Sequence, residues 1–115
     1  KTPCTALFCA NDEMAVGALS YFQEAGISVP RDLSVIGYDD TPSAEFAAPR
    51  LTSVHMPWRE MTLAGINALL NRCYELGRPV ARTFPVSVTM RASLARAAGS
   101  KAKPKAKAKH EGKKT

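Results

Sequence analysis

The stretch TALFCANDEMAVGALSYFQEAGISVPRDLSVIGYDD, residues 5–40, decides the fold. It contains two short apolar runs, residues 5–10 and 33–38, typical of strands that are buried on both faces of a parallel sheet. Between these runs, one apolar helical face is formed by Ala15, Ala18, Leu19 and Phe22. Strand, helix and strand in this order predict a βαβ unit with parallel strands and a right-handed crossover.

The limits of this first helix are marked by residue types that favour helix ends. Asn11 and Asp12 are both good N-cap residues, and the pattern favours Asp12 as the cap while leaving Asn11 open between capping and another role. Gly26 supplies a stop at the other end, and Pro30 supports the break.

The rest of the chain predicts a short helix or turn, two extended stretches and one long helix. We expect these at residues 43–48, 51–54, 58–76 and 84–89, the third being the long helix. Pro57 precedes that helix, and Gly77 and Pro79 are expected to stop it. Its apolar stripe consists of Leu63, Ile66, Leu69, Leu70 and Cys73.

The net charge of +6 belongs to the end of the chain. From Lys101 onward there are seven lysines and one acid, whereas residues 1–100 hold nine basic and nine acidic residues. We therefore divide the chain into a folded region, residues 1–99, and a basic disordered tail, residues 100–115. The tail is typical of segments that contact nucleic acid without sequence preference, and equally of a solvated extension without a partner.

Cysteine usage and motifs argue against several classes of protein. Cys4, Cys9 and Cys73 are odd in number, fit no zinc or redox spacing, and are expected to be buried free thiols in a reducing compartment. No apolar run approaches the roughly 20 residues that span a membrane. Neither a nucleophile motif nor a phosphate loop nor a metal set is present, so we expect no enzyme, cofactor or metal. His55 is interpreted as a partly exposed polar residue.

Polar residues follow both strands of the predicted βαβ unit. Ligands of open parallel sheets bind beyond the carboxyl ends of the strands, where Asn11 and Asp39 are expected to face one crevice. A carboxylate and an amide suit a polyhydroxylated ligand, because together they accept from and donate to hydroxyls. One of Asp39 and Asp40 is alternatively expected to turn the backbone and face water. Trp58 could stack on a sugar or simply pack at a helix start.

The runs TALFCANDEMAVGAL and GISVPRDLSVIGYDDTPSAEFAAPRLTSV resemble the C-terminal effector-binding region of the LacI/GalR family of transcription repressors. Within that family the chain is most similar to the galactose-responsive members. The resemblance covers about residues 3–96. It implies an α/β, type I periplasmic-binding-protein-like fold of two lobes with parallel sheets, of which only the C-terminal portion is present here.

The resemblance also implies roles for individual segments and residues. Residues 1–54 and 88–96 would form the C-terminal lobe, and residues 58–87 would cross the hinge to the other lobe. The ligand, a galactose-like hexose, would contact Asn11, Asp39 and Trp58. A homodimer would form through Val16, Ser20 and Phe46.

The protein is thus expected to act in the cytoplasm as the sugar-sensing part of a repressor. Operator DNA would be contacted only through an N-terminal helix-turn-helix domain that these residues do not contain. The alternative is part of a periplasmic sugar-binding protein, which shares the fold. It is disfavoured by the repressor-like Asp-Asp-Thr-Pro segment and the unpaired cysteines.

Overall fold

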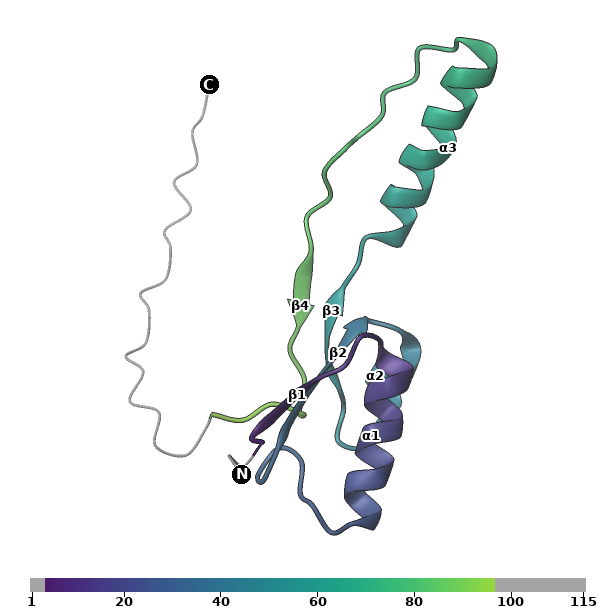
Figure 1. Ribbon diagram of the computed structural model, residues 1–115. Coiled ribbons are helices and arrows are strands. Elements are labelled where there is room, and N and C mark those ends of the chain that lie inside the picture. Colours follow the sequence, from purple (N-terminus) through teal and green to yellow (C-terminus); the bar gives the residue numbers. More distant parts are fainter. Residues whose placement is uncertain (1–3, 97–115) are drawn as a thin grey trace, which may run out of the picture.

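A computed structural model describes residues 4–96 of the chain as an α/β unit from which one long helix projects (Figure 1). The elements in order are β1 (Ala6–Phe8), α1 (Asp12–Glu24), β2 (Ser34–Asp39), α2 (Pro42–Phe46), β3 (Thr52–His55), α3 (Trp58–Tyr74) and β4 (Ser87–Thr89). The sheet order is β1-β2-β3-β4. The first three strands are parallel and β4 is antiparallel to β3. The predicted parallel βαβ unit is therefore confirmed.

The core lies between the sheet and α1. Ala15 and Leu19 of the predicted apolar face are buried, and Ala18 and Phe22 are half-buried against the core. From the sheet side and its connections the core receives Cys9, Leu33, Val35, Ala44 and Leu51. Gly26 takes a positive φ of 71° just after α1, as a glycine at a helix C-terminus commonly does.

The prediction that the first strand is buried on both faces is wrong for this chain. β1 is only three residues long, and Phe8 at its end is 61% exposed. The physical reason is its position: β1 is the edge strand of the sheet, and α1 covers only one face of it (Figure 1).

The segment between β3 and β4, residues 56–86, extends away from the sheet, and we call it the arm (Figure 1). It consists of α3 and an extended return, held together by the Asn71 side chain, which accepts from Arg78 N and donates to Arg78 O, each at 2.7 Å. α3 ends at Tyr74 with left-handed Glu75 as its cap, three residues before the predicted Gly77 stop. The predicted apolar stripe is largely exposed, Leu63, Ile66 and Leu69 included.

Two of the three cysteines are exposed, contrary to prediction. Cys9 is buried in the core, and burial raises the pKa of its thiol. Cys4 precedes β1 and Cys73 lies on the exposed side of α3, and apolar neighbours in sequence do not bury a thiol where no element covers the surface. The predicted tail, residues 100–115, lies outside the described residues.

Candidate functional site

The carboxyl ends of three adjacent parallel strands meet at one edge of the sheet, the edge from which the arm leaves (Figure 1). Phe8 pairs with Ile36 across β1 and β2. Asn11 and Asp39 each lie three residues beyond this pair, and Trp58 lies three residues beyond the end of β3. The predicted juxtaposition of strand ends is therefore present. Of the residues near these ends, Trp58 belongs to the arm and not to the sheet.

Asn11 is the N-cap of α1. Its side-chain oxygen accepts a hydrogen bond of 2.9 Å from the backbone N–H of Met14, which satisfies one of the unpaired donors of the first helical turn. Within residues 4–96 the amide NH₂ of Asn11 makes no hydrogen bond, so it is free to donate to a ligand. Capping and ligand contact are thus compatible for this residue.

The preference for Asp12 as the cap is wrong. The Asp12 side chain points inward and is 0% exposed. It accepts hydrogen bonds from Ser53 Oγ at 2.6 Å, from Thr41 N at 2.7 Å and from Thr41 Oγ1 at 3.0 Å. One carboxylate therefore links the start of α1, the turn after β2 and the middle of β3. Sequence reasoning missed this role because Ser53 and Asp12 are 41 positions apart, and only the sheet brings them together.

Asp39 has a backbone conformation that is rare for a residue with a side chain. Its φ is 102°, and that of the following Asp40 is 56°, so both residues turn the chain at the end of β2. Such strain of roughly 1–3 kcal/mol is concentrated at ligand sites. The half-buried Asp39 carboxylate accepts no hydrogen bond within the described part of the chain. Its acceptor oxygens are available to a bound molecule.

Asp40 makes the contacts that Asp39 lacks. Its carboxylate is 2.8 Å from Thr89 Oγ1 and 3.0 Å from His55 Nδ1, and it forms an ion pair of 2.7 Å with Arg91 Nη2. Burial alone would raise the pKa of Asp40, but hydrogen bonds from Thr89, Arg91 and His55 outweigh it and hold this pKa below the ordinary 3.8. Asp40 therefore does not face water as an isolated turn residue, and His55 is its partly exposed partner.

Trp58 begins α3 and is 51% exposed. Together with Arg59, Thr62, Leu63 and Ile66 it lines an open hollow of about 450 Å³ on the arm. The exposed face of an indole ring is suited to stacking on the apolar face of a sugar. Trp58 does stand at the start of a helix and half of its surface is covered, so the alternative role of packing at a helix start is equally compatible with the structure.

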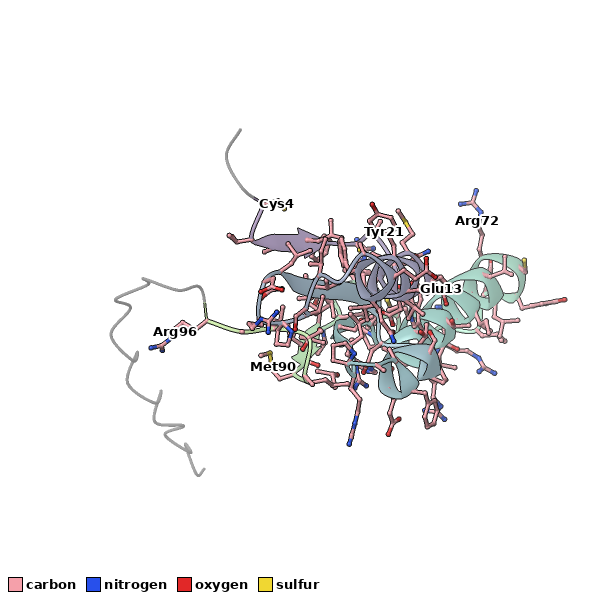
Figure 2. All side chains as sticks on the ribbon, turned by 90° about the horizontal axis from the view of Figure 1, so that it is seen from below. Cys4, Glu13, Tyr21, Arg72, Met90 and Arg96 are labelled. Carbon is pink, nitrogen blue, oxygen red and sulfur yellow. The ribbon has the colours of Figure 1, made fainter. Side chains whose placement is uncertain are left out.

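The three residues predicted to form a dimer interface lie on α1 and α2, which pack on each other. Phe46 is 82% exposed, Ser20 is exposed, and Val16 is half-buried because it also packs against the core. Glu13 and Tyr21 of α1 point outward as well (Figure 2). This outer surface of the α/β unit contains large apolar side chains that no other element covers within residues 4–96.

Two general features of the described residues bear on other classes of function. No helix of the described part is both long and apolar enough to cross a membrane. Across residues 4–96 there is no cluster of three or more His, Cys, Asp or Glu side chains placed to hold a metal ion.

Residues 1–94 match the family described as periplasmic binding protein-like domain. The HTH-type transcriptional repressor PurR of Haemophilus influenzae is 42% identical over 85 residues, which are 74% of this chain and 25% of PurR. A LacI-family transcriptional regulator of Burkholderia phymatum has a solved structure with 60% identity and a TM-score of 0.74, covering 80% of this chain and 34% of that one. The regulator CelR in complex with cellobiose has 35% identity and a TM-score of 0.72, with coverages of 79% and 28%.

The fold is an α/β unit with polar groups at the carboxyl ends of its parallel strands, the place where open α/β sheets in general bind ligands. The chain belongs to the periplasmic-binding-protein-like domain family, and its relatives are transcriptional regulators of the LacI family. The predicted family and fold class are confirmed, whereas these relatives do not single out the galactose-responsive members. The chain spans a quarter to a third of the length of the relatives it matches.

Proposed function

We propose that this chain is the effector-sensing part of a sugar-responsive transcription repressor. The observation that carries the proposal is that Asn11, Asp39 and Trp58 lie at or just beyond the carboxyl ends of three adjacent parallel strands, with the Asp39 carboxylate unpartnered within residues 4–96. The relatives are regulators rather than enzymes, in agreement with a role in sensing rather than catalysis.

The chemistry of this edge supports a sugar as the effector. The Asp39 carboxylate would accept from two hydroxyls, the Asn11 amide would donate to a third, and the Trp58 ring would cover an apolar face. CelR, a structural relative, was solved with cellobiose. We propose galactose or a related hexose as the ligand, on the basis of the sequence resemblance.

The second half of the site would come from the lobe against which the arm packs. The exposed apolar residues Leu63, Ile66 and Leu69 on α3 have no cover within residues 4–96, as expected for a helix that completes another lobe. Effector binding between the lobes would then favour one arrangement of the arm over the other. By linkage, the same preference would change the affinity of the whole regulator for operator DNA, in the cytoplasm.

We further propose that the chain forms a homodimer through Val16, Ser20 and Phe46. The support is the exposed apolar surface of α1 and α2, with Phe46 at 82% exposure. Sedimentation velocity of the wild-type chain and of Phe46→Glu tests this: the variant should sediment as a monomer under conditions where the wild type is dimeric. Leu69→Glu, on the arm, is the matched control and should not change the sedimentation coefficient. A wild type that stays monomeric at all concentrations contradicts the proposal for this chain.

The sugar site is tested in a two-lobed protein. Residues 4–96 replace the matching segment in the 60% identical Burkholderia phymatum regulator, and calorimetry measures hexose binding to this chimera. Asp39→Asn should weaken binding by roughly 10-fold or more, because one charge-assisted hydrogen bond contributes about 1.5–3 kcal/mol. Glu45→Gln, an exposed acid on α2, is the control. Equal affinities of the wild-type chimera and Asp39→Asn would show that the site lies elsewhere.

A further inference from the structure

The contacts of Asp40 join the end of β2 to the end of β3, where the chain leaves for the arm, and to the end of β4, the strand that follows the arm. His55 is the last residue of β3, where the chain leaves for the arm, and Thr89 is the last residue of β4, two residues after Ser87, where the chain has rejoined the sheet. Arg91 follows two residues later. The Asp40 carboxylate touches all three side chains, at 3.0, 2.8 and 2.7 Å respectively.

The Asp40–Arg91 ion pair is protected from water and fixed to the sheet. Only 12% of the Asp40 side chain and 15% of the Arg91 side chain are exposed, so their ion pair is screened less than a surface pair. Arg91 also donates from Nη1 to Leu51 O and from its backbone N–H to Thr52 Oγ1, each at 2.9 Å. The backbone N–H of Asp40 donates to Ser53 Oγ at 3.1 Å.

The neighbouring Asp39 provides the contrast. It occupies the next position of the same turn, carries the same carboxyl group and makes no side-chain hydrogen bond within residues 4–96. Of two adjacent carboxylates, one is thus free for a ligand and the other is bound to the strands on either side of the arm.

We propose that Asp40 is a positioning residue that holds the arm in one orientation relative to the sheet. Its three partners tie the last residue of the strand that precedes the arm to the end of the strand that follows it, and so fix the base about which the arm would otherwise turn. Asp39 and Asp40 are consecutive residues. A ligand held by the Asp39 carboxylate would therefore influence the orientation of the arm through Asp40. This consequence rests on the proposed function, whereas the restraint on the arm stands on the contacts alone.

The orientation of the arm is measured as a distance between two spin labels in the full chain. One label is attached to native Cys73 on α3 and the other to α1 in a Glu13→Cys variant, since Glu13 points outward (Figure 2). Cys4→Ser removes the other exposed thiol, and buried Cys9, whose pKa is raised by burial, should resist labelling, as mass spectrometry checks. Dilution with unlabelled chain leaves only distances within one molecule.

We expect a narrow distance distribution for the otherwise unchanged chain and a broader one for Asp40→Asn, which keeps the shape but removes the charge. Asp39→Asn should leave the distribution narrow. Circular dichroism establishes that each variant is folded, and if Asp40→Asn is not, Thr89→Val takes its place and should also broaden the distribution. A narrow distribution in the folded Asp40 or Thr89 variant, or equal broadening by Asp39→Asn, overturns the proposal. No sugar is present, so neither result depends on the proposed ligand.

Discussion

Replacing the buried Asp12 with alanine should destabilise the α/β unit. The carboxylate is 0% exposed and accepts three hydrogen bonds of 2.6 to 3.0 Å. Each hydrogen bond to a charged group contributes about 1.5–3 kcal/mol, but the three share one carboxylate and are not additive. Asp12→Ala leaves the Ser53 and Thr41 donors without an acceptor, at about 1–3 kcal/mol for a buried donor, and we expect a total loss of about 3 kcal/mol because Ser53 is buried but Thr41 only half-buried.

The assay is urea unfolding of the full chain, followed by circular dichroism. Because small domains are stable by only about 5–15 kcal/mol, a loss of this size moves the midpoint far to lower urea. Glu13→Ala is the matched control: it is the next acid in the same helical turn, it is exposed, and it should cost about 1 kcal/mol or less. If Asp12→Ala and Glu13→Ala have the same midpoint, the buried carboxylate does not stabilise the fold as described.

Three further predictions concern neighbouring residues. Gly37→Ala would place a Cβ in overlap with Asp12 Oδ1 and within 2.9 Å of Leu51 Cδ2, so it should destabilise the wild type in the same urea assay. The effect should be smaller in the Asp12→Ala background, where only the overlap with Leu51 remains. Asn11→Ala removes the helix cap and should lower the free energy of unfolding by about 1 kcal/mol, seen as a lower Tm in calorimetry. Because the pKa of Asp40 in the folded chain lies below 3.8, the stabilising effect of its charge is fully present above pH 3.8 and is lost as the pH falls through the folded pKa. The difference in urea midpoint between the wild type and Asp40→Asn should therefore shrink toward pH 2. A difference that stays constant with pH would contradict this.

The sheet and the first helix could be predicted because their signals are local. Each signal needs only a short stretch of sequence: the apolar runs at residues 5–10 and 33–38, a capping residue between them, and Gly26 after the helix. The parallel pairing follows, since a helix between two strands requires a crossover. The short strands were harder: the expected strand at 84–89 is observed only as Ser87–Thr89, because pairing with β3 sets its length.

The contacts within the site could not be predicted, because they join residues far apart in sequence. Asp12 and Asp40 look like ordinary helix-start and turn residues until β3 and β4 bring Ser53, Thr89 and Arg91 beside them. One signal was available: Gly37 inside a strand indicates that another group approaches the backbone closely, and that group is Asp12. The exposure of Phe46 likewise depends on what the rest of the chain leaves uncovered.

The central claim, that this chain senses an effector for a DNA-binding repressor, is tested most directly by operator binding of the chimera with the Burkholderia phymatum regulator. Fluorescence anisotropy of labelled operator DNA is measured with and without hexose, for the wild-type segment and for Asp39→Ala. The account predicts that the hexose changes operator affinity in the wild-type chimera, and that Asp39→Ala abolishes this response but binds operator as tightly as before. An undiminished response in Asp39→Ala would contradict it.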